Sequence, residues 1–281
     1  MVRNRSRLIE DLVVVIVSVV VTFGVLLASG RISTTSASGG TQSTYDQIIS
    51  RGTLRAGIPV AGLPVATRDA SGTVVGVVPD MAAEMAKALG VKLEIVDTAT
   101  ANRIPDLVAG KIDFTIGTIT LDRAKSVSFT NPWAVDGTAA AFLKSSGITS
   151  YSDIKGKKIV VVTGATGDLV ATAQYPDNTI TRVDQVSTAV AAVQSGQADV
   201  VFDDYSTLSL ASADNANLVT LNPLTVEPSG IMVQLGDQKW VNWLNWFLDD
   251  YYSSGVSTCG CGFTSYKKWF KVTPPPLTFH Y

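Results

Sequence analysis

The feature that most constrains the fold of this chain is an alternation of short β-branched runs with amphipathic segments along most of its length. Thr53–Ile58 and Lys158–Gly164 have the length of strands, and the second is apolar until it closes on glycine, as in a strand buried on both faces. Residues 79–89 place apolar side chains three and four positions apart, the period of an amphipathic helix, and Gly90 is typical of a helix end. Alternation of this kind predicts an α/β fold with helices on both faces of each sheet.

The alternation comes in two blocks. The first block has expected strands at Thr53–Ile58, Val91–Val96 and Asp113–Gly117 and expected helices at 79–89 and 103–109. The second has expected strands at 158–164, 179–183, 198–204 and 218–221, with helices at 167–174, 186–195 and from Tyr205. The segment Leu143–Gly156 separates the blocks, and helices at 240–252 and 266–270 follow before Pro274–Pro276 end regular structure. Two α/β lobes are therefore expected.

The N-terminal segment has the pattern of an export signal. Arg3, Arg5 and Arg7 precede an apolar run from Leu12 to Ala28, which ends in small residues as a cleavage site does. At the helical rise this run covers about 26 Å, just short of a bilayer core. A cleaved signal peptide and an uncleaved membrane anchor both fit residues 1–30. Either way the positive-inside rule places the rest of the chain outside the cytoplasm.

Composition narrows the function of the remainder. Residues 31–43 include STTSASGGTQS, which has too few apolar side chains to order and is expected to be a flexible linker. The 22 Lys and Arg are balanced by 24 Asp and Glu, with no basic stretch after the leader, so nucleic acid is not an expected partner. The single histidine, His280, argues against a Ser-His-Asp or Cys-His hydrolase. We expect no metal and no cofactor; Cys259 and Cys261 could pair, although so small a ring is strained, and the sequence leaves this open.

Three strand ends are candidates for a ligand site. In open α/β sheets, ligands lie beyond the carboxyl ends of the strands and near helix N-termini. Ile116–Arg123, Thr163–Gly167 and Asp203–Tyr205 are each expected at such a point, and each is rich in hydroxyls, glycine or charge.

Ordered motifs across the chain resemble family 3 of the bacterial extracellular solute-binding proteins, the polar-amino-acid receptors of ABC importers. The run Gly110–Trp133, GKIDFTIGTITLDRAKSVSFTNPW, is similar to the family signature, and GTLRAGI, SGQADVVFDD, EPSGIMV and YKKWF match further parts of the pattern. The resemblance extends from about Tyr45 to Phe270.

The resemblance implies a two-lobed periplasmic binding protein fold of type II, with two hinge crossovers. Residues 44–141 and 228–281 would form the first lobe and residues 142–227 the second. It further implies a monomeric, non-enzymatic receptor in the periplasm or outside the cytoplasm, with an amino acid as ligand and an ABC permease as partner. The membrane would be touched only through the N-terminal segment.

The resemblance also implies how an amino acid would be held. Arg123 aligns with the arginine that forks onto the ligand's α-carboxylate, a bidentate contact that lysine cannot make. Thr118 would add its hydroxyl and amide, and the carbonyl of Ile116 would accept from the ligand's ammonium group. Asp204 aligns with the aspartate that accepts the α-ammonium from the opposite lobe; its neighbour Asp203 is expected to point to the other side of the strand. If the alignment shifts by one residue, the two aspartates exchange these roles.

A glycine-rich turn and a second arginine complete the candidate site. Thr163–Gly167 opens a helix of the second lobe, so its backbone N–H groups and the Thr166 hydroxyl would form an anion cradle, with Gly167 at the helix start. The N-R-I-P segment at Arg103 resembles the glutamate/aspartate-binding branch, in which that arginine helps to hold a side-chain carboxylate, with Thr100 beside it. The acidic receptors usually bring another basic residue from the first loop, and residues 57–66 hold none. An acidic amino acid is thus modestly favoured.

Two other functions remain open from the sequence. Cyclohexadienyl dehydratases resemble this family closely, and Glu227 would be the candidate acid of such an enzyme. An uncleaved anchor would also fit a membrane-tethered sensory receptor.

Overall fold

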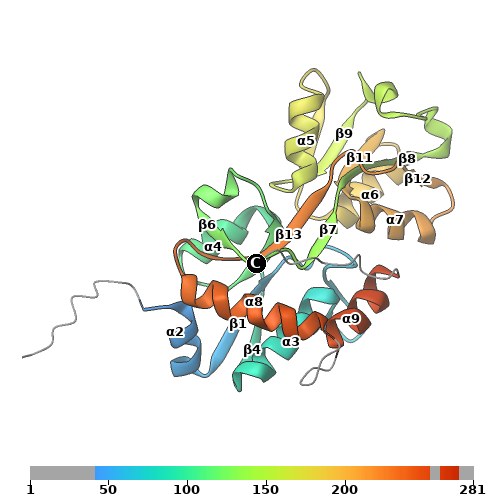
Figure 1. The fold of residues 1–281 in the computed structure, drawn as a ribbon. Helices are drawn as coiled ribbons and strands as arrows, with labels where there is room; N and C mark the ends of the chain where they lie inside the picture. The colour runs from blue at the N-terminus through green and yellow to red at the C-terminus, as the bar shows by residue number, and fades with distance from the viewer. Residues whose placement is uncertain (1–41, 254–259, 272–281) are drawn as a thin grey trace, which may run out of the picture. The chain divides into compact units, whose positions relative to one another are not determined.

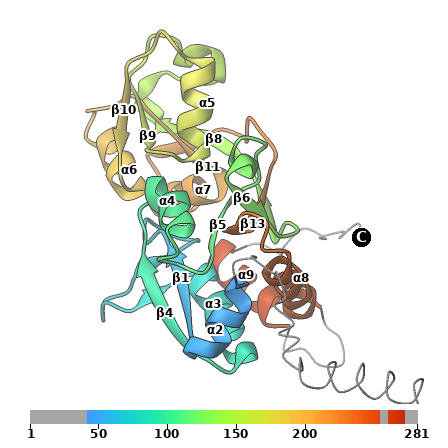
Figure 2. The same cartoon turned by 90° about the vertical axis from the view of Figure 1, so that its left-hand side faces the viewer.

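The described part of the chain, residues 42–253 and 260–271, is seen in a computed structural model as two groups of strands and helices (Figure 1). The view turned by 90° separates the same two groups (Figure 2). We call them the first and second lobes. Within the described ranges, no helix is both long and apolar enough to span a bilayer. The leader at 1–30, nearly all of the linker, Cys259 and Pro274–Pro276 lie outside the described residues, whereas Cys261 takes part in a disulfide.

The first lobe contains both ends of the described chain. Its helices are α2 (Thr44–Arg51), α3 (Val77–Leu89), α4 (Arg103–Val108), α8 (Gln238–Tyr252) and α9 (Cys261–Phe270), with short 3-10 turns η1 (Thr100–Asn102) and η2 (Arg123–Lys125). Its strands are β1 (Thr53–Ile58), β2 (Thr67–Arg68), β3 (Val74–Val75), β4 (Lys92–Asp97), β5 (Thr115–Thr118), β6 (Val127–Phe129), β7 (Ala134–Asp136) and β13 (Glu227–Gln234).

The sheet of the first lobe is mixed. Strand β1 pairs with β4 in parallel, and a bridge from Ala56 to Phe114 places the segment leading into β5 beside it. Strand β13 runs antiparallel to β5 on one side and to β6 and β7 on the other. Its main core joins α3, α8 and α9 to one face of these strands, and a smaller cluster around Leu107 and Met232 fills the α4 side.

The second lobe is one five-stranded sheet with helices on both faces. Its strands, in the order β10-β9-β11-β8-β12, are β8 (Thr138–Leu143), β9 (Ile159–Val162), β10 (Ile180–Val183), β11 (Val200–Asp204) and β12 (Leu218–Thr220). Its helices are α5 (Thr166–Gln174), α6 (Val186–Gln194) and α7 (Tyr205–Asp214), with turns η3 (Lys144–Ser146) and η4 (Tyr151–Ile154).

Alternation along the central strands decides which helix covers which face. Val160 and Val201 join the cluster with α6 and α7, whereas Val161 and Phe202 join the cluster with α5. All four side chains are fully or nearly fully buried. Because every residue of β9 is apolar, both faces of the sheet can be covered, as the continuous apolar run predicts.

Two crossovers join the lobes. The chain leaves the first lobe between β7 and β8 and returns between β12 and β13, and β7 and β13 run side by side at this junction (Figure 1). Leu224 N donates to Thr138 O across the two crossovers at 2.8 Å. All of β8 pairs within the second-lobe sheet, and the lobe boundaries remain a prediction.

Most expected elements are present, but four strands of the structure have no counterpart among the predicted elements. The strand at Thr53–Ile58 has the expected bounds, and α3 begins two residues earlier than expected and ends at Leu89, where Gly90 takes φ +67°. Strands β6, β7, β8 and β13 were not anticipated, and most of them pair antiparallel. Each finds its partner far along the chain, so local alternation carries little signal for them.

Candidate ligand-binding site

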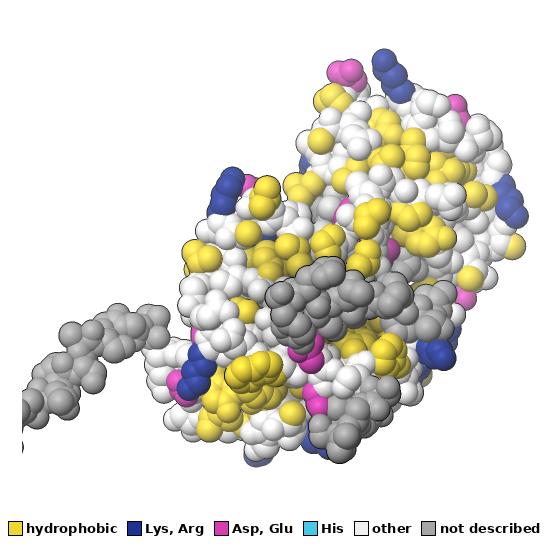
Figure 3. Space-filling model, viewed as in Figure 1, with side chains coloured by type: hydrophobic (Ala, Val, Ile, Leu, Met, Phe, Trp, Pro, Cys, Tyr) yellow, Lys and Arg dark blue, Asp and Glu magenta, His cyan; other side chains and the backbone are white. Residues whose placement is uncertain are grey.

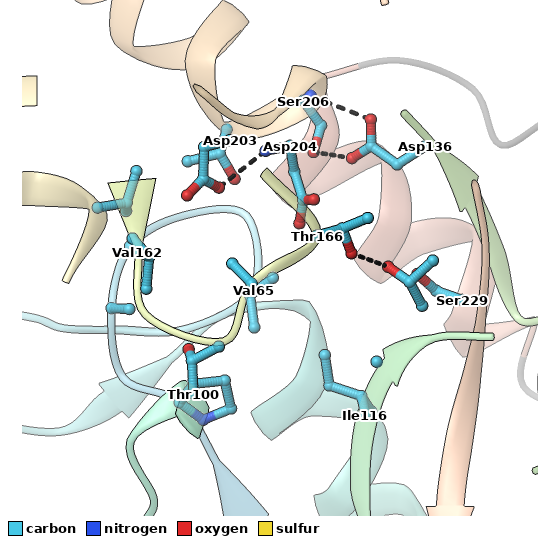
Figure 4. Close-up of a pocket in the computed structure, with 18 of the residues that line it drawn as sticks. Val65, Thr100, Ile116, Asp136, Val162, Thr166, Asp203, Asp204, Ser206 and Ser229 are labelled. Atoms are coloured by element: carbon cyan, nitrogen blue, oxygen red, sulfur yellow. Dashed lines mark hydrogen bonds between the residues drawn. The ribbon is translucent and has the colours of Figure 1, made fainter. Parts of the chain in front are cut away.

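A cavity lies at the junction of the two lobes, where strand ends of both meet. Its volume is about 100 Å³, several times the roughly 10–15 Å³ that one water molecule needs. The wall combines side chains that follow β1, β4 and β5 with side chains at the ends of β9 and β11 (Figure 4). A small organic molecule can therefore be held at the edge where open α/β sheets bind ligands.

Six of the nine residues expected at the site line this cavity. They are Thr100, Arg103, Ile116, Thr118, Thr166 and Asp204. The other three, Arg123, Thr163 and Gly167, adjoin the wall without lining it. Their roles toward a ligand stay predictions, but their neighbours in the structure can be described one by one.

Arg123 joins the two lobes at one end of the cavity. Its Nη1 donates to the carbonyl of Thr118 at 2.9 Å, and its Nη2 donates across the junction to the carbonyl of Gly164 at 3.1 Å. Beside it, Thr166 Oγ1 and Thr118 Oγ1 are 3.0 Å apart, again from opposite lobes. Burial lowers the pKa of the guanidinium, and the charges of Asp204 and Glu227 raise it. The cation is thus held by neutral carbonyls rather than by an ion pair.

The glycine-rich turn brings the start of α5 against β11. Gly164 has φ +74°, which turns the chain into the helix, and α5 begins at Thr166. A Cβ on Gly167 would lie 2.6 Å from the carbonyl oxygen of Phe202, so only glycine allows this approach. The Thr163 hydroxyl donates to Val183 O within the second lobe at 3.2 Å. Gly167 therefore sets the distance between the amides of α5 and the end of β11.

Arg103 is buried at the start of α4 and is already engaged. Its Nε donates to Thr100 O at 3.0 Å and its Nη1 to Ile116 O at 2.7 Å. Burial lowers its pKa to about 10, aided by Arg123, while the charges of Asp204 and Asp203 raise it. The guanidinium stays charged at neutral pH, and the Ile116 carbonyl, expected to accept from a ligand, already accepts from Arg103.

Two adjacent aspartates face the cavity, not one. Asp203 lines the wall together with Asp204, although strand alternation predicts that it points away. The alternation fails because β11 ends here and Asp204 is already the residue from which α7 starts. Burial raises the pKa of Asp203 to about 6, and burial and the charge of Asp203 raise that of Asp204 well above its usual range.

Asp136, at the end of β7, is a wall residue that no motif or strand-end pattern predicts. One of its oxygens accepts from the N–H of Gly137 and of Ser206, and the other accepts from the Ser206 hydroxyl (Figure 4). Burial raises its pKa, and the charge of Glu227 adds to that effect. The only local signal is a charged residue directly after a short apolar run and before a glycine.

The remaining wall is largely apolar. Val65 and Pro59 from the loop after β1, with Val162 and Val186 from the second lobe, are apolar residues of the cavity wall. Among the residues that the structure describes, no three His, Cys, Asp or Glu side chains are placed to hold a metal ion. The arrangement offers cationic donors from the first lobe, the Asp203 and Asp204 carboxylates from the second and apolar residues in the same wall, which suits a small dipolar molecule.

Comparison with known proteins decides the family. The bacterial extracellular solute-binding proteins of family 3 match residues 54–272, which cover both lobes and every wall residue. This chain belongs to that family. The fold expected from the motifs, a two-lobed binding protein with mixed sheets, is confirmed.

Relatives of this solute-binding protein carry different ligand names. The ABC transporter glutamine-binding protein of Bacillus subtilis is 30% identical over 211 residues, covering 73% of this chain and 76% of the relative. The glutamate/aspartate import solute-binding protein of Salmonella typhimurium is 27% identical over 252 residues, covering 83% and 82%.

Two solved structures align over most of the solute-binding protein. A mutant of ArgBP from T. maritima has a TM-score of 0.76 and 32% identity, covering 82% of this chain and all of that one. An ancestral amino acid-binding protein described as a precursor of cyclohexadienyl dehydratase has a TM-score of 0.75 and 33% identity, covering 81% and 100%.

Glu227, the candidate acid of a dehydratase, is held inside the hinge. Its Oε1 accepts from the N–H of Thr138 at 3.2 Å, from the Thr138 hydroxyl at 2.7 Å and from the Thr225 hydroxyl. Its Oε2 accepts from Thr118 Oγ1 at 3.4 Å. The side chain is buried and is not one of the described residues that line the cavity. Its contacts are those of a group that ties the two crossovers together.

Proposed function

We propose that this solute-binding protein binds a free α-amino acid between its lobes, outside the cytoplasm, and delivers it to the permease of an ABC importer. The observation that carries the proposal is the opposition of charges across the junction. Arg123 and two threonine hydroxyls lie at one end of the cavity, and the Asp204 carboxylate faces them from the second lobe. An α-amino acid carries the matching pair of charges on neighbouring atoms.

In this proposal the α-carboxylate takes over donors that now bond to the protein. Arg123 would turn its two N–H groups from the carbonyls of Thr118 and Gly164 to the ligand, and the N–H groups at the start of α5 would add to them. Asp204 would accept from the α-ammonium. Because Arg123 comes from the first lobe and Asp204 from the second, the full set of contacts forms only when both lobes meet the ligand, so binding favours the closed arrangement.

The relatives support an amino acid as the ligand class. Their names include glutamine, histidine, arginine and glutamate/aspartate as bound or imported solutes, so the class is shared and the side chain differs. The names alone do not select a side chain for this chain. An acidic side chain would have to be held by Arg103, which already donates to two carbonyls.

A panel of amino acids tests the proposal directly. We expect at least one L-amino acid to raise the melting temperature of the purified exported protein, because a ligand of the folded state stabilises it by mass action. Arg123→Ala and Asp204→Asn should lose this shift. Lys125→Ala, on the same turn as Arg123, and Asp214→Asn, exposed at the end of α7, should keep it.

A full response from Arg123→Ala would overturn the carboxylate assignment, and no response to any amino acid would overturn the proposed function.

The dehydratase alternative has its own test, motivated by the likeness to a dehydratase precursor. We expect no turnover when prephenate is mixed with the protein and followed spectrophotometrically, because Glu227 is engaged by threonine donors in the hinge. Turnover that disappears in Glu227→Gln would favour the enzyme.

Export and assembly are also part of the proposal. Sequencing the N-terminus of the exported protein distinguishes the two forms, because a start near Arg31 identifies a cleaved signal peptide. An uncleaved start identifies the membrane-tethered form. We expect a monomer by light scattering after size-exclusion chromatography.

A further inference from the structure

The charges around the cavity do not balance. Three carboxylates line it, those of Asp136, Asp203 and Asp204, and the carboxylate of Glu227 lies behind the wall. Only two cations of the described residues lie at the cavity, Arg103 in the wall and Arg123 beside it. An α-amino acid adds one positive and one negative charge at its backbone end, so it leaves this surplus of negative charge unchanged. Inside a protein such a surplus is costly, because charges are poorly screened there.

The four carboxylates differ in how far the protein already satisfies them. Both oxygens of Asp136 accept hydrogen bonds from Gly137 and Ser206, and both oxygens of Glu227 accept from threonines. These two are satisfied without a ligand.

The remaining two are not satisfied. Asp203 Oδ1 accepts only from the N–H of Asp204 at 2.8 Å, and within the described residues no donor reaches Asp203 Oδ2 or either oxygen of Asp204. The Asp203 residue is nevertheless 8% exposed and lines the cavity. A buried carboxylate without full hydrogen bonding requires a partner. The α-ammonium of an amino acid can satisfy Asp204, which leaves Asp203.

Arg103 does not supply that partner. It comes from the opposite lobe, and its Nε and Nη1 are held by Thr100 O and Ile116 O. Within the described part of the chain, Arg103 donates hydrogen bonds to carbonyls alone, and it acts on Asp203 only through its charge. A cationic group on a bound ligand can supply this partner.

The two aspartates point toward different residues of the wall. In Figure 4, Asp204 extends toward Thr166, whereas Asp203 turns toward Val162. Thr166 contacts Thr118, whose carbonyl accepts from Arg123, so Asp204 extends toward the side of the Arg123 contacts. Val162 is one of several apolar residues in the wall, with Val65, Pro59 and Val186. Apolar walls that end in a carboxylate fit an alkyl chain that ends in a cation.

We propose that the cavity selects a cationic amino acid, one whose side chain ends in an ammonium or guanidinium group, and that Asp203 receives this group. The proposal rests on the proposed function and specifies its ligand. The backbone of the ligand uses Arg123 and Asp204, and the methylene chain passes the valines. An acidic side chain would instead bring a further carboxylate to an already anionic cavity.

Isothermal titration of the exported protein at pH 7.5 tests the proposal, with L-arginine, L-lysine, L-ornithine, L-glutamine and L-glutamate as ligands. A cationic amino acid should bind roughly 30-fold or more tighter than glutamate, the scale of one buried charge pair. It should also bind tighter than glutamine, whose amide could bond to Arg103 and Asp203 but carries no charge.

Asp203→Asn should lower the affinity for the tightest cationic ligand by roughly 30-fold or more and that for glutamine by much less. Asp203→Glu, which restores the charge, should recover part of the loss. Asp214→Asn is the matched control, because Asp214 is exposed at the far end of α7. Thermal unfolding without ligand verifies that each variant is folded.

The outcomes separate this inference from the proposed function. Tighter binding of glutamate or glutamine than of all three cationic ligands overturns the inference and leaves an amino-acid receptor. Unchanged arginine and lysine affinities in a folded Asp203→Asn variant overturn the role of Asp203. Absence of binding by every amino acid tested overturns the proposed function itself.

Discussion

The first-lobe and second-lobe walls of the cavity differ in how many hydrogen bonds their charged side chains make within the protein. On the first-lobe side, Arg103 and Arg123 each donate to two backbone carbonyls, so both cations are hydrogen-bonded before any ligand arrives. On the second-lobe side, Asp203 has one internal donor and Asp204 has none among the described residues. The charged groups of the first-lobe wall therefore have hydrogen-bond partners within the protein, whereas the two aspartates of the second-lobe wall lack most of theirs.

This difference shows which end of a ligand gains most from binding. A cationic group meets carboxylates that lack partners, so its hydrogen bonds are new. An anionic group meets guanidiniums that must first release carbonyls, so its hydrogen bonds replace others. Exchange of hydrogen bonds contributes less than satisfaction of a buried charge. The second lobe is therefore the wall where ligand charge matters most.

The largest expected effect contrasts one residue from each wall. Asp204→Asn should weaken ligand binding by roughly 30-fold or more, yet make the ligand-free protein more stable, because it removes a carboxyl group whose pKa is raised by burial and by the charge of Asp203. Arg123→Ala should weaken binding and also lower stability, because it loses two hydrogen bonds, each worth about 0.5–1.5 kcal/mol. Titration calorimetry and urea unfolding measure the two quantities. Equal loss of stability in both variants would contradict the contrast between the walls.

The next effect is the dependence of stability on pH. The pKa of Asp203 is about 6 in the folded protein, above the ordinary value of 3.8, so the folded state keeps a proton that the unfolded chain has released between those values. The free energy of unfolding should then fall as pH rises from about 4 to about 6, by up to about 3 kcal/mol for this group. Urea unfolding without ligand at pH 4.5 and 7.5 measures the fall.

Asp203→Asn should reduce that fall, whereas Asp214→Asn, exposed on the surface, should match the wild type. If the free energy of unfolding falls equally with pH in Asp203→Asn and in the wild type, Asp203 is not the group responsible.

Substitutions at two glycines, one beside each wall, test how rigid the surroundings of each wall are. A Cβ at Gly167 would meet backbone, the Phe202 carbonyl at 2.6 Å, whereas one at Gly117 would meet the flexible end of Met232 at 2.8 Å. Gly167→Ala should therefore lower the free energy of unfolding by about 1–3 kcal/mol and Gly117→Ala by less. Urea unfolding of both variants decides, and a larger loss for Gly117→Ala would reverse the order.

The smallest expected effect concerns the hydroxyl contact between the walls. Thr166→Val removes the 3.0 Å hydrogen bond to Thr118 and should weaken ligand binding by about 0.5–1.5 kcal/mol. Thr181→Val, exposed on β10, is the control and should bind as the wild type does. If the two variants bind equally well, the contact contributes nothing to closure.

Local patterns in the sequence were sufficient for the parts of the fold that depend on neighbours in the chain. Strand β9 and helix α3 follow from apolar periodicity, and Gly90 marks a helix end because it adopts a left-handed conformation. Strand β13 did not follow, because proline and glycine interrupt its pattern and its partners β5, β6 and β7 lie about a hundred residues away.

The candidate site divides in the same way. Thr118, Thr166 and Asp204 follow from strand ends and motifs, and all three line the cavity. The inward position of Asp203 did not follow, because alternation assumes that the strand continues, whereas β11 gives way to α7 at this point. The hydrogen bond from Arg103 to the Ile116 carbonyl could not be predicted either, because it forms between two segments that meet only in the folded protein.

On the face shown in Figure 3, Lys and Arg side chains stand singly at the margins and form no continuous basic patch. This agrees with the balanced composition of the chain, in which 22 basic residues meet 24 acidic ones.

A line of hydrogen bonds runs from the cavity into the hinge. The Thr166 hydroxyl meets that of Thr118, which donates to Glu227, and Glu227 accepts in turn from Thr138 in the first crossover and Thr225 in the second. A molecule that forms a hydrogen bond with the Thr166 or Thr118 hydroxyl competes with this line of hydrogen bonds, and so affects the bond that Thr118 donates to Glu227. If the protein binds an amino acid here as proposed, occupancy of the site would change the hydrogen bonds at the hinge, so the same few oxygen atoms would sense the ligand and stiffen or loosen the joint.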